Sequence, residues 1–383
     1  PQTLLTPLHS RNTLFPRQAG FLPGKDTMLN VFALHALIAY QAKRKLPLHA
    51  VLVDVSKAYD SVLHSKLFST LYDHGLPAHL VAGVVGMYAG LQYKLAMPGQ
   101  ACHAIDVGIG VKQGCPLSPF LFNLYIAGLA AHLGTSVVNE GGSGFLIPPL
   151  QTAVCDFLYA DDLVLVDGTS HARLQQSLTQ ASSYLAPLNL HLNVPKCVGI
   201  SFNHWYGPER HQRMYLTIEG TRVPYADDDG GCGVVYLGTY FDREGSLEGM
   251  ATRRTQCFVT AFHAAMSNLR AAPHLPTSVP LVMRMLHVVA APAGLYGCDV
   301  WGLSQLSLPT APVARDTLLP KLFALSDPLE HQRCLLLRRH FRLPLQVPHL
   351  LLLHELGCRP FGIQYVLRAV GLYNRLLKAG SSY

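Results

Sequence analysis

The chain has 383 residues, of which 49% are hydrophobic and 14% are charged, and its formal net charge is +7. This apolar composition excludes an intrinsically disordered chain, and the basic excess suits a phosphate-bearing partner without proving one. Nine cysteines without a Cys-x-x-Cys pair do not support a zinc ribbon or knuckle. No membrane partner is expected, because the most apolar C-terminal stretch, 280–297, is interrupted by Arg284, His287 and Pro292.

The first predicted element is a helix over 27–42. Asp26 can accept a hydrogen bond at its start, and three basic residues precede Pro47 at its end. A short buried strand is expected over 49–54. The helices expected next are over 61–71, 78–88, 118–133 and 172–185. The expected strands are over 91–97 and 101–107, two more within 154–166 and one within 192–203. Tight turns are expected at Pro98-Gly99 and within 154–166, and a loop rich in Gly and Pro over 139–149.

The character of the sequence changes near Gly245. A short hairpin is expected around Tyr236-Leu-Gly238, and helices interrupted by prolines follow residue 245. The stretch 303–314 is rich in Pro, Ser and Leu and reads as a linker, before final helices over 328–342 and 362–378. We therefore expect divisions near residues 245 and 302.

Two adjacent carboxylates, Asp161 and Asp162, lie between the apolar segments 157–160 and 163–166. Neighbouring residues of a strand face opposite sides, whereas a hairpin turn can present both together. Two such carboxylates repel each other and are costly to bury, and a bound divalent cation removes both costs. Mg²⁺ is typically held by one or two carboxylates together with substrate phosphates. An ordinary acidic turn is the alternative for this segment alone.

A third carboxylate, Asp54, ends the predicted strand and precedes a helix. The carboxyl end of a strand is a common ligand position in open sheets. Of its neighbours, Asp60 reads as a helix N-cap or a solvated residue, Lys57 as a surface residue and Tyr59 as a core residue.

The segment 110–119, Gly-Val-Lys-Gln-Gly-Cys-Pro-Leu-Ser-Pro, precedes the helix predicted from 118. Its glycines allow close backbone approach to a ligand, and Gln113 offers both a donor and an acceptor. A plain loop before a helix is the alternative for this segment.

In chain order, these three segments resemble motifs A, B and C of reverse transcriptases, and above all those of non-LTR (LINE-like) retrotransposons. Four further blocks carry the same resemblance, which extends from about residue 17 to about residue 365. They are Arg17-Gln-Ala-Gly-Phe21 (a shared upstream block), Leu192-Asn-Val-Pro-Lys196 (motif D), Tyr236-Leu237-Gly238 (motif E) and Tyr296-Gly-Cys-Asp-Val-Trp301 (a thumb block).

The resemblance implies an α+β right-hand polymerase fold whose palm carries an antiparallel sheet. Its expected domains are partial fingers and palm over 1–245, a helical thumb over 246–302, and a linker with a C-terminal helical extension over 303–383. The family's Arg-Pro-Ile-type block would lie before Pro1, so the chain is expected to be an excerpt with truncated fingers. The endonuclease and Cys/His knuckle of many relatives are not visible in it.

The resemblance also implies roles for single residues. The expected cofactor is a pair of Mg²⁺ ions, with Mn²⁺ as a substitute, and the expected metal ligands are Asp54, the Val55 carbonyl, Asp161 and, in support, Asp162. Lys196 is expected to donate a proton to pyrophosphate. The expected nucleotide contacts are Tyr59 (under the sugar, excluding a ribose 2′-OH), Gln113 and Gly114. The expected primer and template contacts are Tyr236, Leu237, Gly238, Arg253 and Arg254.

The implied function is RNA-directed DNA synthesis in retrotransposition, with template RNA, a DNA primer and dNTPs as partners. The family implies a nuclear location, and a cytoplasmic one during assembly with RNA. Three alternatives stay open. They are a degenerate or domesticated fragment that binds RNA or RNA–DNA hybrid without catalysis, another reverse transcriptase branch such as an intron maturase, and an unrelated Mg²⁺-dependent hydrolase. The hydrolase leaves Gln113, Tyr59 and the thumb-like tail unexplained.

Overall fold

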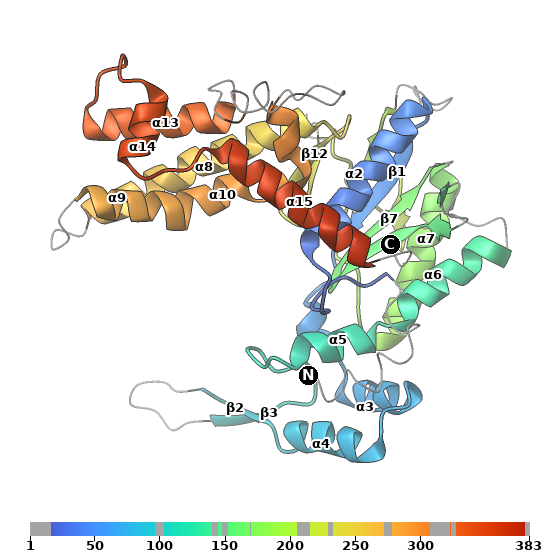
Figure 1. The fold of residues 1–383 in the computed structure, drawn as a ribbon. Coiled ribbons are helices and arrows are strands. Elements are labelled where there is room, and N and C mark those ends of the chain that lie inside the picture. The colour runs from blue at the N-terminus through green and yellow to red at the C-terminus, as the bar shows by residue number, and fades with distance from the viewer. Residues whose placement is uncertain are drawn as a thin grey trace. The chain divides into compact units, whose positions relative to one another are not determined.

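A computed structural model describes residues 17–95, 103–139, 145–147, 152–168, 170–204, 215–228, 233–271, 278–306, 322 and 327–379. The chain forms two compact units (Figure 1). The first contains residues 1–30 and 36–232, and the second contains 31–35 and 233–381. The expected division near residue 245 lies inside the second unit, because the hairpin over 233–242 packs on the helix that follows it.

A four-stranded antiparallel sheet organises the first unit, in the order β6-β7-β1-β8. Its strands are β1 (Leu48–Val53), β6 (Asp156–Tyr159), β7 (Asp162–Asp167) and β8 (Val198–Phe202). The helix α7 (His171–Leu185) lies along the sheet against β7 and β1, and α6 (Gly128–Asn139) packs on α7 (Figure 1). The predicted α+β class with an antiparallel sheet is thus confirmed.

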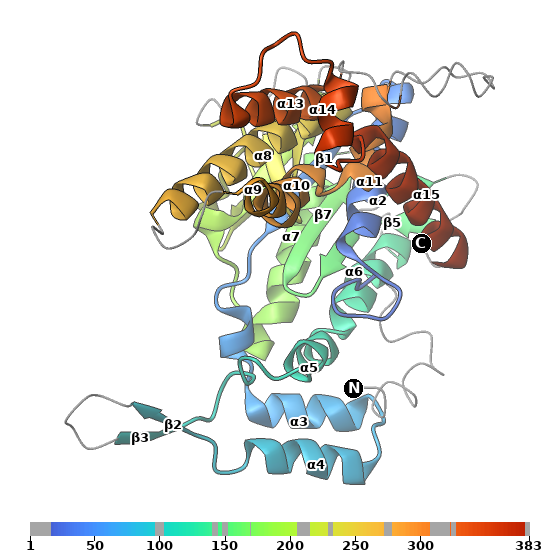
Figure 2. The ribbon, with the colours of Figure 1, turned by 60° about the vertical axis from the view of Figure 1, so that its left-hand side comes forward.

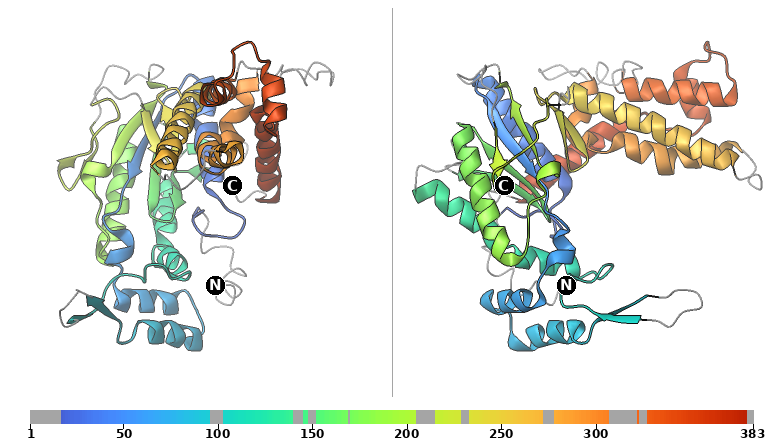
Figure 3. Two further views of the ribbon diagram at one scale, coloured as in Figure 1. Left: turned by 90° about the vertical axis from the view of Figure 1, so that its left-hand side faces the viewer. Right: turned by 180° about the vertical axis from the view of Figure 1, so that it is seen from behind.

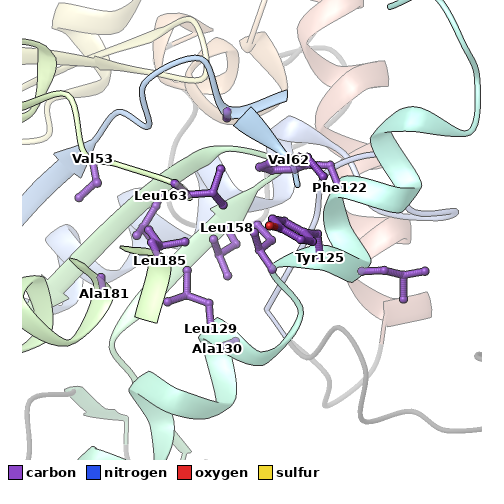
Figure 4. Close-up of a cluster of buried hydrophobic side chains, with 14 of the residues drawn as sticks. Val53, Val62, Phe122, Tyr125, Leu129, Ala130, Leu158, Leu163, Ala181 and Leu185 are labelled. Carbon is purple, nitrogen blue, oxygen red and sulfur yellow. The ribbon is translucent and has the colours of Figure 1, made fainter. Parts of the chain in front are cut away.

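The main core of this unit lies between the sheet and these helices. Alternate residues of β1, Val51 and Val53, point to this side together with Leu163 and Leu165 of β7. They meet the apolar stripe of α7, which includes Leu185 (Figure 4). Burial of such side chains is worth roughly 1.5–3 kcal/mol each, so the core fixes the strand ends that carry the carboxylates.

The first unit contains further helices and strands outside this sheet. Helices α3 and α4 form an antiparallel pair (Figure 2). These elements are α2 (Thr27–Lys43), η1 (Ala58–Ser61), α3 (His64–Asp73), α4 (Ala78–Tyr88), β2 (Gln92–Leu95), β3 (His103–Asp106), α5 (Ser118–Tyr125), β4 (Phe145–Ile147), β5 (Thr152–Val154), η2 (Ala186–Leu188), η3 (Val194–Lys196), β9 (Thr217–Ile218) and β10 (Thr221–Arg222). The predicted turn at Pro98-Gly99 lies outside the described residues.

Some of the predicted elements differ in detail from the structure. The helix expected over 118–133 is interrupted after Tyr125, near Gly128, where an added Cβ would lie 2.4 Å from the Tyr184 hydroxyl of α7. The strand expected within 192–203 is β8, which follows a 3-10 turn that contains Pro195. The loop expected over 139–149 contains β4, whose Phe-Leu-Ile sequence favours a strand.

The second unit is mainly helical. The hairpin β11 (Gly233–Tyr236) and β12 (Thr239–Asp242) precedes the long helix α8 (Leu247–Arg270), which is drawn in yellow and packs along α10 and α13 (Figure 3). The remaining elements are α9 (Val279–Met285), the π-helix η5 (Leu286–Ala290), α10 (Ala291–Leu295), α11 (Cys298–Trp301), η6 (Gly302–Leu306), α13 (Pro328–Phe341), α14 (His349–Glu355) and α15 (Phe361–Ala379). Because α15 packs on α11 and η6, the C-terminal helices belong to the same compact unit as α8. Most of the predicted linker over 303–314 lies outside the described residues.

No single helix in the described part of the chain has both the length and the apolar composition needed to cross a membrane. Val279–Leu295 and Cys298–Leu306 meet these criteria only as a pair, which is bent by 64°.

Candidate active site

Two carboxylates meet at a hairpin turn of the first unit. Tyr159 of β6 pairs with Asp162 of β7, so Ala160 and Asp161 form a two-residue turn between the strands. Ala160 has a φ of 56°, in the left-handed region that such turns require at their first central position. The predicted strand, tight turn and strand are therefore confirmed, and the turn places Asp161 and Asp162 at one end of the sheet.

The third carboxylate belongs to the neighbouring strand. Val53 pairs with Leu163, so the next residue, Asp54, follows the end of β1 beside Asp162. Burial raises the pKa of Asp161, and the negative charge of Asp54 raises it further. Burial, together with the charges of Asp161 and Asp54, raises the pKa of Asp162 to about 6. The structure thus brings Asp54, Asp161 and Asp162 close enough for the charge of Asp54 to raise the pKa of the other two carboxylates.

The donor set suits a hard divalent cation that shares its ligands with a substrate. Within the described residues, no group of three or more His, Cys, Asp or Glu side chains is arranged to hold a metal ion by itself. Mg²⁺ is typically bound by one or two carboxylates plus substrate phosphates, not by a closed protein cage. Carboxylates that repel one another at the end of a sheet therefore fit an ion whose coordination a phosphate completes.

Backbone hydrogen bonds fix the segment that carries Asp54. The Asn193 N–H donates to the Asp54 carbonyl oxygen (2.8 Å), and the Ser56 N–H donates to the His191 carbonyl oxygen (2.8 Å). In this antiparallel bridge Val55 is the residue between the two bonds, so its own N–H and C=O point away from the 191–193 segment. The Val55 carbonyl, a predicted metal ligand, therefore accepts no hydrogen bond within this bridge.

Tyr59 lies in η1, beside the carboxylates. Its ring centroid is 4.6 Å from that of Phe122 in α5, and its side chain is half-buried. Burial raises the pKa of Tyr59, and the charges of Asp161 and Asp162 raise it further. An aromatic side chain that packs on Phe122 thus lies next to the acidic turn. Its contact with a nucleotide sugar stays a prediction.

The glycine-rich segment is tied to the residues that follow Asp54. The Gly110 N–H donates to the Val62 carbonyl oxygen (2.8 Å), and the Val111 N–H donates to the Tyr59 carbonyl oxygen (2.9 Å). The exposed Gln113 amide donates to the Asp60 carboxylate (3.5 Å). Gly114 is exposed and has a φ of 77°. The predicted nucleotide contacts Tyr59 and Gln113 therefore belong to one hydrogen-bonded unit.

Lys196 is an exposed residue of η3. Its backbone N–H donates to the Asn193 carbonyl oxygen (2.9 Å), and Asn193 is the residue bonded to Asp54. The proton-donor role of Lys196 stays a prediction.

The predicted primer and template contacts belong to the second unit. Leu237 (φ 44°) and Gly238 (φ 74°) form the two-residue turn of the hairpin β11–β12, and the Tyr236 side chain is buried. The Tyr296 hydroxyl donates to the Leu237 carbonyl oxygen (2.7 Å). Gly238 is exposed. The contacts of Tyr236, Leu237 and Gly238 with primer or template stay predictions.

The two predicted contact arginines of α8 differ in their surroundings. Arg253 is exposed. The Arg254 guanidinium lies 4.7 Å from the Tyr296 ring centroid and donates to the Ala293 carbonyl oxygen (3.4 Å), and burial lowers its pKa. Arg254 thus supports the tyrosine that holds the turn, which its position in a basic helix did not reveal.

Two residues of the site were not assigned a role from the sequence. Asp60 accepts the hydrogen bond of Gln113, and Gln18, in the upstream block, bonds the backbone of the acidic turn. Both contacts join residues far apart in the chain, so no local pattern indicates them. The available signal was the resemblance of the block 17–21, which contains Gln18, to an upstream block of reverse transcriptases.

The chain is similar to a known protein family and to several known proteins. The family described as reverse transcriptase (RNA-dependent DNA polymerase) matches residues 2–228. A retrovirus-related Pol polyprotein from the type-2 retrotransposable element R2DM of Drosophila melanogaster is 34% identical over 199 residues, which are 51% of this chain and 18% of that protein. A Pol polyprotein from the type-1 retrotransposable element R2 of Popillia japonica is 30% identical over 237 residues, 61% of this chain and 32% of that protein.

The chain therefore spans less than a third of the length of these relatives. Among solved structures, apo telomerase from Candida Tropicalis is similar over 86% of this chain and 54% of that chain, with 10% identity and a TM-score of 0.47.

Proposed function

Because the chain belongs to the reverse transcriptase (RNA-dependent DNA polymerase) family, we propose that its protein adds dNTPs to a primer 3′-OH on an RNA template by two-metal phosphoryl transfer. The observation that carries this proposal is the meeting of Asp54, Asp161 and Asp162 beside Tyr59. The relatives are polyproteins of R2 retrotransposable elements, in agreement with the predicted non-LTR resemblance. We further propose that synthesis serves retrotransposition and starts from a nicked target.

In this mechanism, Asp54, Asp161 and the Val55 carbonyl would hold two Mg²⁺ ions, and Asp162 would support them. Bound there, the ions would lower the pKa of the primer hydroxyl and neutralise the charge of the departing pyrophosphate. Asp54 and Asp161 would act on the reacting groups through these ions, and no covalent intermediate with the protein is needed. Lys196 is the proposed proton donor to pyrophosphate.

The experiment is a dNTP incorporation assay with an RNA template, a DNA primer and Mg²⁺. Asp161→Ala should lower incorporation by a factor of about 10³ or more, since loss of a charged group aimed at the transition state costs several kcal/mol. Asp73→Ala is the matched control, because Asp73 is an exposed carboxylate at the end of α3. Equal activity in wild type and Asp161→Ala contradicts the catalytic proposal. Binding of RNA or hybrid without metal-dependent synthesis supports the alternative of a non-catalytic, domesticated fragment.

A further inference from the structure

The acidic turn contains a backbone conformation that its own sequence does not favour. Ala160 has a φ of 56°, and residues other than glycine, asparagine and aspartate are uncommon there. Hairpin turns with positive φ usually place Asn, Asp or Gly at this position. Ala160 is also 3% exposed, so its peptide groups need partners from the protein.

One side chain supplies both of these partners. The Gln18 amide oxygen accepts from the Ala160 N–H (2.7 Å), and the Gln18 amide nitrogen donates to the Ala160 carbonyl oxygen (3.2 Å). Gln18 is 4% exposed, and its oxygen also accepts from the Gly20 N–H (2.8 Å). A single buried amide therefore bonds both polar groups of the residue that precedes Asp161.

The segment that carries Gln18 is itself held against the strands of the hairpin. The Ala19 N–H donates to the Leu158 carbonyl oxygen (2.9 Å), and Arg17 forms an ion pair with the buried Asp156. The Asn123 amide of α5 donates to the Gly20 carbonyl oxygen (2.6 Å). The contact of Gln18 with Ala160, here called the Gln18 clamp, is thus held by bonds of the segment 17–20 to β6 and to α5.

Gly20 is required by the closeness of this contact. A Cβ at this position would lie 2.4 Å from the Ala160 nitrogen, a distance that real Cβ atoms essentially never show. Only glycine lets the backbone of this segment lie directly on the turn. The upstream block is therefore shaped to the conformation of Ala160.

We infer that Gln18 is a positioning residue of the active site, which fixes the left-handed conformation of Ala160 and so sets where the Asp161 and Asp162 carboxylates point. The part of this inference that concerns catalysis rests on the proposed function. A displacement of about 1 Å in a reacting constellation can cost a factor of about 10² in rate, so loss of the clamp acts on turnover.

The test compares Gln18→Met with Gln41→Met. Methionine keeps the length of the side chain and removes its hydrogen bonds. Gln41 is the matched control, because it is fully buried in α2 and donates to the Pro47 and Gly168 carbonyl oxygens (3.0 and 3.3 Å), away from the acidic turn. Both variants lose the bonds of one buried amide, and only one of them releases Ala160.

Hydrogen–deuterium exchange of the whole chain gives a readout that needs no activity. In Gln18→Met, exchange in peptides covering 158–162 should rise by a factor of about 10 or more relative to Gln41→Met, because the Ala160 N–H loses its acceptor. Equal exchange of these peptides in the two variants would overturn the inference.

In the incorporation assay, Gln18→Met should lower kcat by about 10- to 100-fold relative to Gln41→Met and leave the KM for primer–template within about twofold. Faster exchange with an unchanged kcat would reject the positioning role. If the wild-type chain incorporates no nucleotide while the exchange difference is present, the proposed function fails and the clamp on the turn stands.

Discussion

At the scale of single residues, Tyr59 is the side chain from which sugar discrimination is expected. It is half-buried, it rests on Phe122 and it lies beside Asp161. Tyr59→Val removes the ring that would block a ribose 2′-OH, so rNTP incorporation should rise by about 10-fold or more relative to dNTP incorporation, which corresponds to a change of about 1.4 kcal/mol. Single-nucleotide kinetics with paired dNTP and rNTP substrates measure this ratio. Unchanged discrimination, with Tyr59→Phe as the control that keeps the ring, would reject the gate.

Gly110 provides a second test at this scale. Its φ is 87°, and an added Cβ would lie 3.2 Å from the Asp60 carbonyl oxygen. Gly110→Ala should lower the free energy of unfolding by about 1–3 kcal/mol, because alanine is strained in this conformation. Gly108→Ala is the control, since Gly108 is exposed and a Cβ there meets no atom within 4 Å. Urea unfolding measures the free energy of unfolding of both variants. Equal values would contradict the requirement for glycine at position 110.

At the scale of elements, α8 carries two neighbouring arginines with different expected effects. Arg254→Met removes the guanidinium from the Tyr296 ring and should lower the free energy of unfolding by about 1–2 kcal/mol. Arg253→Met should leave the free energy of unfolding within about 0.5 kcal/mol. If Arg253 contacts a phosphate, its loss lowers the slope of log affinity against log salt by about 1. Thermal unfolding and salt-dependent binding to an RNA–DNA duplex measure both effects, and identical behaviour of the two variants contradicts this assignment.

Local patterns were sufficient for much of the element order. The predicted helix over 78–88 is α4 with the same bounds, and the strand–turn–strand around Asp161 is present, because apolar periodicity and turn residues act within a few positions. The break after Tyr125 was not predicted, and the close approach of the Tyr184 side chain to Gly128 is a contact with another helix that no local pattern indicates.

The same limit applies to the site. Asp54 and Asp161 could be placed at strand ends from the sequence, and the register of β1 with β7 is what makes them neighbours. The Gln113–Asp60 bond and the Gln18 clamp depend on contacts across 53 and 142 positions, and such contacts follow from the assembled fold.

At the scale of the whole first unit, stability should depend on pH through a histidine pair on the sheet. The rings of His49 (β1) and His171 (α7) are 4.1 Å apart. Burial lowers the pKa of His49 to about 4. Burial, followed by the charge of His49, lowers the pKa of His171 to about 3, and the charge of Asp167 acts in the opposite direction. His49 contacts the Ser201 hydroxyl (3.0 Å) and His171 the Tyr225 hydroxyl (2.8 Å).

Between pH 6.5 and about 4 the unfolded chain binds protons that the folded chain does not bind, so stability falls as the pH falls through this window. The loss due to His49 is at most about 3 kcal/mol. Urea unfolding at pH 7 and pH 5 should show this loss of stability, and the loss should be smaller in His171→Phe. His79→Phe is the control, because His79 is an exposed residue of α4, and it should leave the loss unchanged. A pH dependence that is unchanged in His171→Phe would contradict this origin.

The strand order β6-β7-β1-β8 has a consequence for synthesis of the chain. The strand that leads to Asp54 is made first and lies in the middle of the sheet, between partners that begin at Asp162 and Val198. During translation both edges of β1 therefore stay without their final partners while more than a hundred further residues are added. Such long-range pairing is slow and leaves apolar edges open to wrong partners, so a ribosome-bound chain should need protection until β8 has emerged.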